Sequence, residues 1–280
     1  MNIKIMVDSA SDFTELQAKD LGLLFMPISV MLDGEEYLDG VNLFADEFYK
    51  KLESCSSMPQ TSLINEYRWR EVFEEATRDG SDLIVITISS KLSGTYQAAV
   101  DASKKFDNKV FVIDSLNAAC GEGILAKYAL LLRDEGKTAQ EICDKLNEKK
   151  KDICVYAVID TLKYLKKGGR ISTATAIIGT TLSIKPIVGV IDGEVKMIGK
   201  AMGNKKGNLL LNDIVQNKGG IDFDMPWCYL WSGNDKSNIE KYIKDSRHLV
   251  GKKEYSLSIL GSTIGTHVGS GAVGLAFFKK

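Results

Sequence analysis

The amino-acid sequence predicts a two-domain α/β protein, with a parallel sheet in its first half and a mixed α/β second half. Up to about residue 150, short apolar runs alternate with segments of helical periodicity, which is typical of a parallel sheet covered by helices. After the polar run 147–152 the pattern changes to a hairpin followed by helices and strands. We therefore expect an N-terminal domain at 1–150 and a C-terminal domain at 151–280, with a cleft between them.

The expected strands of the first half are short and rich in β-branched residues. The run 82–89 is continuously apolar, as in a strand buried on both faces of a parallel sheet. Asp12 and Glu15 resemble a capping box at the start of the first helix, and Gly22 is a suitable stop. Strands are predicted at 3–8, 24–32, 82–89 and 109–114, and helices at 11–22, 45–54, 65–80, 95–105, 118–136 and 138–150.

The second half begins with a strand at 153–159 and a short helix that paired glycines end at 168–169. Residues 182–199 read as a hairpin because Asp192–Gly193 is a typical two-residue hairpin turn. Further helices are predicted at 205–217 and 234–246, and strands at 227–232 and 255–260. Residues 269–274 are interpreted as a glycine-rich turn leading into a final strand.

Composition excludes several classes of protein. A net charge of −1 gives no broad basic field, so we expect no nucleic-acid partner. No apolar run is long enough to span a membrane, although transient membrane contact stays open. Five cysteines without a C-x-x-C pair, after an N-terminus that reads as a strand, indicate reduced thiols in the cytoplasm. Two histidines are too few for a histidine-rich metal site, and neither a metal nor a cofactor is expected.

The stretch "ISSKLSGTYQ" at 88–97 follows a buried strand and is rich in hydroxyl groups. A nucleophilic serine in a hydrolase elbow needs the pattern G-x-S-x-G, but Lys91 stands where the first glycine should be. Gly94 lets a ligand approach the backbone, and the first N–H groups of the next helix favour an anion. Ser93 and Thr95 add hydroxyl donors, so the stretch can cradle a negative group or simply cap the helix.

Other polar stretches are candidates for the same site. Residues 7–12 and 114–123 follow strands whose carboxyl ends, like that of 82–89, are expected at one edge of the sheet. Thr61, in "PQTS", is interpreted on its own as a loop residue beside the helix cap Asn65. The segment 269–274 matches G-x-G-x-x-G but lacks the following helix and strand of a dinucleotide site. His267 lies between glycines just before it and is equally consistent with a structural or a binding role.

Taken together, these motifs resemble the DegV family of fatty-acid-binding proteins from about residue 3 to residue 278. The resemblance is carried by "DSASD", "PQTS", "SSKLSGTYQ", "LKYLKKGGRIS", "IKPI" and "IGTHVGSGAVG", in that order. It implies a two-domain α/β fold with one fatty acid enclosed in a tunnel between the domains. It also implies that Thr61, Ser93 and His267 hold the carboxylate beside Gly94 and Thr95, and that Arg170 lies on a face that meets a fatty acid kinase.

Two functions remain open. The first is a non-enzymatic carrier that binds a long-chain fatty acid and presents its carboxylate for phosphorylation by the partner kinase. Hydroxyl groups, helix N–H groups and a protonated His267 are then expected to offset the cost of burying that carboxylate. We also expect Arg170 to be exposed at its helix end and to serve the partner and not the lipid. The alternative is an acyl hydrolase with Ser93 as nucleophile, His267 as base and an aspartate such as Asp114 as the third member.

Overall fold

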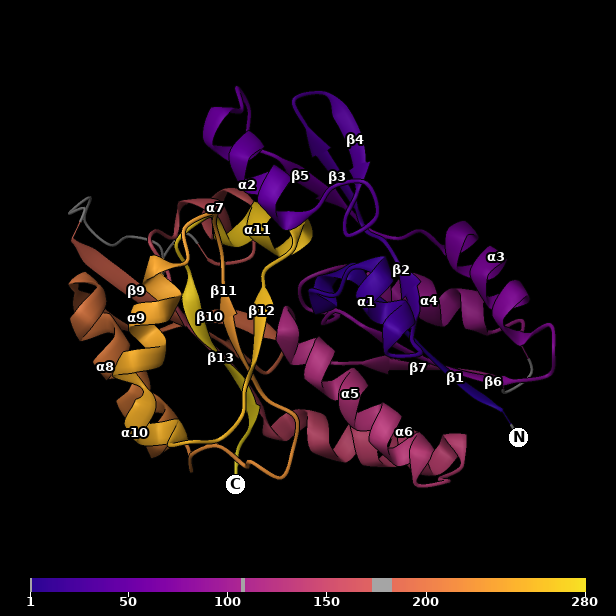
Figure 1. Ribbon diagram of the computed structural model, residues 1–280. Coiled ribbons are helices and arrows are strands. Elements are labelled where there is room, and N and C mark those ends of the chain that lie inside the picture. The colour runs from indigo at the N-terminus through magenta and orange to yellow at the C-terminus, as the bar shows by residue number, and fades with distance from the viewer. Residues whose placement is uncertain (1, 107–108, 173–182) are drawn as a thin grey trace.

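The structure, a computed structural model, describes residues 2–106, 109–172 and 183–280 and confirms the mixed α/β fold (Figure 1). Its first sheet is wholly parallel and has the strand order β2-β1-β6-β7. Every residue of β6 from Leu83 to Thr87 is buried, as the apolar run predicts. The strands are β1 (Ile3–Asp8), β2 (Leu24–Met26), β6 (Asp82–Thr87) and β7 (Val110–Asp114).

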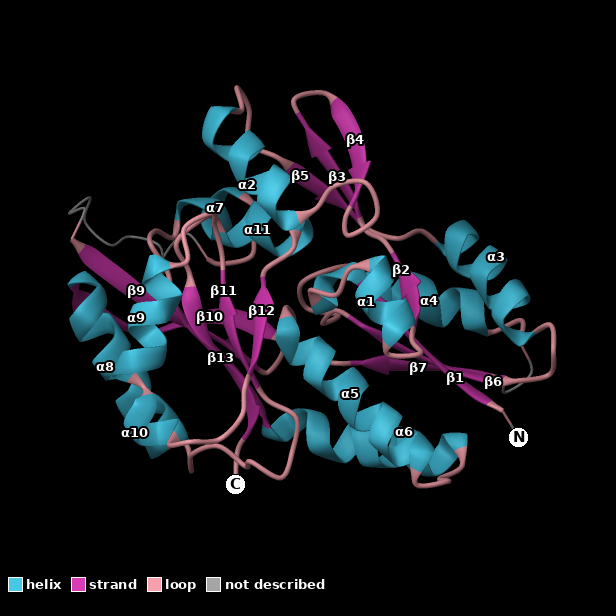
Figure 2. Ribbon diagram, in the orientation of Figure 1, coloured by secondary structure: helices cyan, strands magenta, loops and turns pink. Residues whose placement is uncertain are grey.

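Helices cover both faces of the parallel sheet (Figure 2). One pair consists of α3 (Glu66–Thr77), which Asn65 caps, and α4 (Thr95–Ser103). The other pair consists of α5 (Cys120–Asp134) and α6 (Ala139–Lys149). These helices lie where the sequence predicts them, which leaves the carboxyl ends of the strands open for a site.

The capping box predicted at Asp12 and Glu15 is wrong. Helix α1 (Glu15–Asp20) is capped by Thr14, whose hydroxyl accepts from Gln17 N at 3.2 Å while Gln17 Oε1 accepts from Thr14 N at 3.0 Å. Asp12 instead ends the short 3₁₀ turn η1 (Ser9–Ser11) with a positive φ of 64°. Its buried carboxyl accepts from Gly261 N at 2.9 Å, so a distant contact takes the place of a local cap.

The single strand predicted at 24–32 is broken after Met26, and its second part belongs to a separate antiparallel sheet of order β4-β3-β5. In that sheet Thr61 lies opposite Val30, so the residue interpreted as part of a loop is in a strand. Asp33 and Gly34, with φ of 49° and 88°, form the tight turn between β3 and β4. The elements are β3 (Ser29–Leu32), β4 (Glu35–Leu38), β5 (Gln60–Ser62) and the neighbouring helix α2 (Ala45–Ser54).

The second large sheet is mixed, with the strand order β10-β9-β8-β13-β11-β12. The hairpin at Asp192–Gly193 is confirmed, and the last strand of the chain lies inside the sheet between β8 and β11. The strands are β8 (Ile153–Val158), β9 (Ile184–Ile191), β10 (Glu194–Met202), β11 (Cys228–Trp231), β12 (Ser256–Ile259) and β13 (Val273–Phe278). The helices of this half are α7 (Lys163–Lys167), α8 (Gly203–Asn217), α9 (Ser237–Asp245), α10 (Arg247–Val250) and α11 (Ser262–Val268). The domain boundary near residue 150 stays a prediction; the turn η2 (Lys150–Asp152) lies there.

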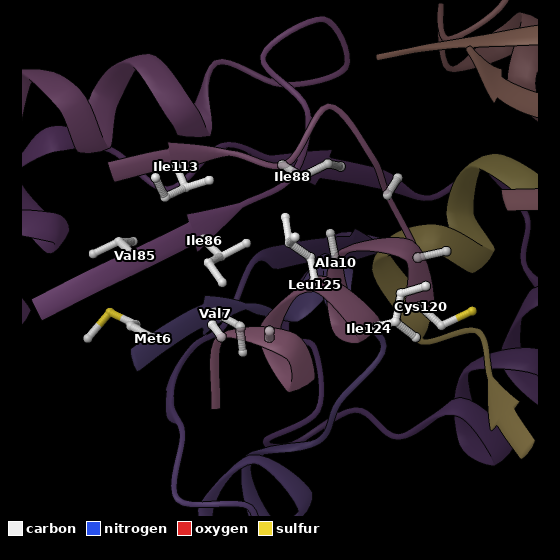
Figure 3. Packing of buried hydrophobic residues seen from close by; sticks show 14 of the residues in the cluster. Met6, Val7, Ala10, Val85, Ile86, Ile88, Ile113, Cys120, Ile124 and Leu125 are labelled. Atoms are coloured by element: carbon white, nitrogen blue, oxygen red, sulfur yellow. The ribbon is translucent and has the colours of Figure 1, made fainter. Parts of the chain in front are cut away.

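Helix α5 lies between the two large sheets and packs on both (Figure 1). Figure 3 shows its side chains Cys120, Ile124 and Leu125 among those of β1, β6 and β7. The same buried cluster continues through Val155 and Leu230 of the second sheet. A Cβ at Gly121 would lie 2.3 Å from Val155 Cγ2, so this glycine is what allows α5 to approach β8 closely.

No element is predicted for residues 262–268, where the structure has helix α11. The predicted glycine-rich turn after it is confirmed by the positive φ of Gly269 and Gly271, and the final strand by β13.

Asp39, which follows β4, caps α11 from 223 residues away. Its Oδ1 accepts from Ser262 N at 2.9 Å and Ser262 Oγ at 2.7 Å, and its Oδ2 accepts from Thr263 N at 3.2 Å. Gly265 then fits against α2, since a Cβ there would lie 2.6 Å from Phe48. Tertiary contacts therefore form a helix that local propensity does not favour.

Four carboxyl groups are buried where these segments meet, on Asp8, Asp12, Asp39 and Glu122. Burial raises the pKa of each of them, and Asp8 reaches about 7. The charges of Asp8 and Asp12 raise the pKa of Glu122 further. Glu122 is therefore protonated in the folded protein at pH values where it is ionised in the unfolded chain.

We expect Glu122→Gln to stabilise the protein increasingly as pH rises. Below the ordinary pKa of 4.5, Glu122 is protonated in both the folded and the unfolded protein, so its ionisation does not change the free energy of unfolding. Above it the unfolded chain gains by ionising, and the free energy of unfolding of the wild type falls by about 1.4 kcal/mol per pH unit for this group. Urea denaturation at pH 5, 6 and 7 measures the difference.

The matched control is Glu53→Gln, which neutralises an exposed carboxylate on α2. Its stability difference from the wild type should change little over the same range. A Glu122→Gln difference that is equally constant would mean that Glu122 ionises as readily in the folded protein as in the unfolded chain.

Candidate functional site

An apolar cavity of about 260 Å³ lies between the two large sheets, the small sheet and α11. Apolar side chains from β8, β9 and β10 line it together with residues from the segments that follow β6 and β7. Its apolar lining is Ile28, Leu63, Ile88, Leu92, Ala118, Ala119, Val155, Ala157, Ile159, Leu165, Val188, Gly189, Val190, Val195, Leu230, Leu260, Ile264 and Val268. Its polar lining, apart from the backbone of Gly94, is Thr61, Ser62, Ser93, Arg170, Thr263 and His267.

Thr61 and His267 meet across this cavity wall. Thr61 Oγ1 on β5 lies 3.0 Å from His267 Nε2 at the end of α11, and the imidazole tautomer decides which of them donates. Burial and the charge of Arg170 lower the pKa of His267 to about 4. Without a bound anion His267 is therefore neutral near pH 7 and can donate only one hydrogen bond, while its protonation beside a bound carboxylate stays a prediction.

The ring of His267 is held from its other side by the glycine that ends α7. A Cβ at Gly168 would lie 2.2 Å from His267 Nδ1, and that nitrogen has no hydrogen-bond partner in the part of the chain that the structure describes. Gly168 thus leaves just enough room for the imidazole. Thr61 on one side and Gly168 on the other fix the position of the ring.

Ser93 lies in the loop between β6 and α4 and lines the cavity beside Gly94, as predicted. Its Oγ lies 2.9 Å from Thr95 Oγ1 and accepts from Thr95 N at 3.2 Å. Thr95 itself is fully buried, does not line the cavity, and accepts from Ile64 N at 3.3 Å. Thr95 therefore positions Ser93 and ties this loop to the segment after Thr61.

Arg170 follows α7 and also lines the cavity. The expectation that its side chain is exposed is wrong, because the guanidinium is half-buried and donates to the carbonyls of Leu92 and Gly168. Burial lowers its pKa below the ordinary value, yet an arginine keeps its charge in proteins. The cavity thus has a fixed cation near His267.

A second hollow of about 260 Å³ adjoins the cavity and shares Thr61, Arg170 and His267 with it. Its other lining residues include Gly168 and Lys167, whose side chain is exposed. A third hollow of about 540 Å³ meets the cavity at Leu92, Arg170 and Val195. The polar residues Thr61, Arg170 and His267 therefore border a hollow that also contains the basic side chain of Lys167.

The catalytic triad considered as an alternative is not formed. Ser93 is paired with Thr95, His267 is paired with Thr61, and Asp114 accepts from the backbone N–H groups of Ser90 and Leu116. No hydrogen bond among the described residues joins the three members. The described residues therefore do not show the hydrogen-bonded triad that the hydrolase alternative requires.

The carboxyl ends of β1, β6 and β7 do meet, as predicted. Asp8 Oδ2 accepts from Ile88 N at 2.9 Å, and Ser89 N donates to Asn117 O at 2.8 Å. However, no residue of 7–12 lines the cavity, which takes Ile88, Ala118 and Ala119 from this edge. The polar side chains of 7–12 hold the backbone together instead.

Sequence reasoning missed the apolar wall and the basic neighbours of the site. Small residues such as Ala157 and Gly189 provide room along β8 and β9, and Lys167 lies beside Arg170. Their residue types are common in any α/β protein. Only Lys167 carried a signal, as part of the basic run 163–170.

The described residues include neither a metal-binding cluster nor a membrane-spanning helix. Within 2–106, 109–172 and 183–280, no three histidine, cysteine, aspartate or glutamate side chains are grouped so that they could hold a metal ion. In that same part of the chain, no helix has both the length and the apolar character needed to cross a membrane.

Sequence comparison places the chain beside proteins of one family. Residues 2–280 match the family model described as an uncharacterised protein of the DegV family. A DegV domain-containing protein of Caldanaerobacter subterraneus subsp. tengcongensis is 36% identical over 279 residues, covering 99% of each chain. One from Clostridium perfringens is 32% identical over 281 residues, covering 98% of this chain and 96% of its own.

Solved structures with the same fold cover the whole chain. A DegV family protein from Thermus thermophilus, whose structure concerns fatty acid binding, matches with a TM-score of 0.89 and 28% identity. DegV from Bacillus subtilis, a fatty acid binding protein, matches with a TM-score of 0.86 and 27% identity. Both comparisons cover 100% of this chain and 100% of the other, so the similarity includes both large sheets.

We expect Gly168→Ala to displace the imidazole of His267. The new methyl group would overlap Nδ1, so the ring must leave Thr61 and move toward solvent. Relief of its burial should raise the pKa of His267 from about 4 toward 6.5. An NMR titration measures this shift, since the chain has only two histidines.

The matched control is Gly199→Ala on β10, where a Cβ would make ordinary contacts of 3.4 Å or more. That variant should leave the His267 titration unchanged. If Gly168→Ala also leaves the His267 pKa near 4, the ring is not confined by Gly168 as described.

Proposed function

The chain belongs to the DegV family, and we propose that it binds one long-chain fatty acid in the apolar cavity and presents the carboxylate to a partner fatty acid kinase. In this proposal the protein is a carrier and not an enzyme, needs no other cofactor, and works in the cytoplasm. The observation that carries the proposal is the division of the cavity. Its wall is apolar except where β5, the Ser93 loop, α11 and Arg170 come together.

The apolar wall accounts for affinity. Burying a methylene group is worth about 0.8 kcal/mol, so a sixteen-carbon tail offers about 10 kcal/mol before the cost of ordering it. Related structures support this choice of ligand, since the Thermus thermophilus and Bacillus subtilis proteins are named for fatty acid binding. Their similarity to this chain extends over its full length.

The polar group accounts for orientation. A buried carboxylate without hydrogen bonds is prohibitively costly, and the cavity offers donors in one place only. The hydroxyl groups of Thr61 and Ser93 and the imidazole of His267 line that place, and the charge of Arg170 lies beside them. We infer that the carboxylate binds there, in contact with Thr61 and Ser93, and that the tail follows the apolar wall.

Presentation to a kinase is supported by the two hollows that adjoin this polar group. A carboxylate held there would lie beside Arg170 and Lys167 and close to the outside of the protein. An acidic surface of a partner, or the phosphate that it transfers, is attracted to such cations. Lys163 and Lys166 on α7 are also exposed and extend this basic surface.

Extraction of the denatured protein, followed by mass spectrometry, should yield close to one fatty acid per chain. For the fatty acid that is found, Ser93→Ala and Thr61→Ala should each weaken binding by about ten- to a hundredfold. A hydrogen bond to a charged group is worth roughly 1.5–3 kcal/mol, and 1.4 kcal/mol is a factor of ten. Their combined effect should not be additive, because both hydroxyls contact one carboxylate.

Ser90→Ala is the control, since Ser90 is exposed in the same loop and does not line the cavity. It should bind as the wild type does. Absence of lipid after extraction, together with no binding of added fatty acid, would contradict the proposed function.

Arg170→Ala tests presentation separately from binding. With fatty acid at saturation, phosphorylation by the kinase should fall by roughly tenfold or more, because a charge-assisted contact is lost. Arg78→Ala removes an exposed arginine from the end of α3 and should have no effect. Unchanged phosphorylation of Arg170→Ala at limiting protein would show that this arginine does not serve the kinase.

A further inference from the structure

Cys120 and Cys228 form a buried pair of thiols. Cys120 is the first residue of α5 and Cys228 is the first residue of β11, and their side chains line the same hollow and influence each other's pKa. They are 4% and 3% exposed, and both are free thiols. Figure 3 shows Cys120 at the start of α5 with its sulfur directed away from Ile124.

The environment of this pair differs from that of the other buried cysteines. Burial raises the pKa of Cys143 to about 12 and also raises that of Cys154, so thiolate formation is disfavoured at both residues. The hydrogen bond from Cys120 and the charge of Lys127 lower the pKa of Cys228, whereas the pKa of Cys120 is raised. Of the two thiols, Cys228 is therefore the one whose ionisation is favoured.

Solvent reaches the pair through a hollow of about 360 Å³, which we call the thiol hollow. Cys120 and Cys228 line it together with Asp12, and its rim includes Gln17 and Leu257. Gln17 is exposed, and Leu257 is 42% exposed on β12. The thiol hollow shares none of its lining residues with the apolar cavity, so a small oxidant has its own route.

The pair lies directly behind the wall of the apolar cavity. Ala118 and Ala119, which precede Cys120, line that cavity, and so does Leu230, two residues after Cys228 on the same face of β11. Ala119 has φ 58° and ψ −155°, a conformation that a residue with a Cβ rarely adopts. A movement of Cys120 is therefore transmitted to the cavity through a backbone segment that is already strained.

We propose that Cys120 and Cys228 are an oxidation site that closes to a reversible disulfide when a small hydroperoxide enters the thiol hollow. We further infer that this disulfide weakens fatty acid binding, an effect that rests on the proposed function. The bond would draw the first turn of α5 toward β11 and narrow the cavity at Ala119. Overfilling an apolar site of this kind weakens binding by about tenfold.

The chemistry is balanced in two steps. The thiolate of Cys228 attacks one oxygen of the hydroperoxide, the O–O bond breaks, and the alkoxide that leaves takes up the proton given up by the thiol. The resulting sulfenic acid is attacked by the sulfur of Cys120, which loses its proton as the S–O bond breaks and water leaves. Two thiols are oxidised to one disulfide, and the hydroperoxide is reduced to an alcohol and water.

The test is to treat the purified protein with tert-butyl hydroperoxide and map its peptides without reduction. A peptide that joins Cys120 to Cys228 should form and disappear on addition of dithiothreitol. Fatty acid affinity should fall by about tenfold in the oxidised protein and return on reduction. Cys143→Ser, which removes a buried cysteine of α6 outside the pair, should respond as the wild type does. Cys228→Ser should keep its affinity under peroxide.

Each outcome decides one part of the proposal. Absence of the joined peptide in wild-type protein overturns the oxidation site, whatever the variants do. A disulfide that leaves fatty acid affinity unchanged overturns the coupling to the cavity. If neither reduced nor oxidised protein binds fatty acid, the proposed function fails, while the peptide map still decides the oxidation site.

Discussion

The arrangement of the site depends on one carboxyl group, that of Asp39. It accepts hydrogen bonds from Ser262 N at 2.9 Å and Thr263 N at 3.2 Å. These bonds fix the start of α11 against the small sheet. Tyr49 of α2 reinforces this position by donating to Leu260 O at 2.9 Å. A seven-residue helix with a central glycine is not stable by itself, so these contacts decide whether it forms. Because α11 carries His267, the same contacts bring the imidazole to Thr61.

These contacts require carboxyl groups to be buried, which is unfavourable for their charged forms. Asp12 binds Gly261 N just before α11, and Asp8 binds Ile88 N, so buried carboxyls organise both the start of α11 and the edge of the parallel sheet. Each pKa is raised, since burial disfavours the charge and neighbouring carboxyls add to the effect. The neutral forms still accept hydrogen bonds from backbone N–H groups. The raised pKa values thus favour neutral carboxyls in the interior, which lowers the cost of burying these polar connections.

How far the sequence predicts the structure follows from how local each feature is. The parallel sheet, its covering helices and the hairpin at Asp192–Gly193 are encoded by periodicity and turn residues within each segment. Helix α11 is not, because its cap comes from Asp39 and its central Gly265 fits against Phe48 of α2. The exposure expected for Arg170 was wrong for the same reason, since its guanidinium bonds to Leu92 O, 78 residues away. Motifs identified Ser93, Gly94 and His267 at the cavity, but no periodic pattern marks Ala157 or Gly189 as its wall.

Among the described residues, the polar side chains of the cavity are paired with neutral groups and not with a catalytic base. A nucleophilic serine needs a base aligned on its hydroxyl, yet Thr95 contacts Ser93 and Thr61 contacts His267. Each candidate thus has a neutral partner that orients it without removing its proton. Such pairs leave hydrogen-bond donors fixed in place before a carboxylate arrives, so little ordering is needed on binding. Under the proposed function, the neutral imidazole and the fixed charge of Arg170 would together neutralise one carboxylate and release it unchanged.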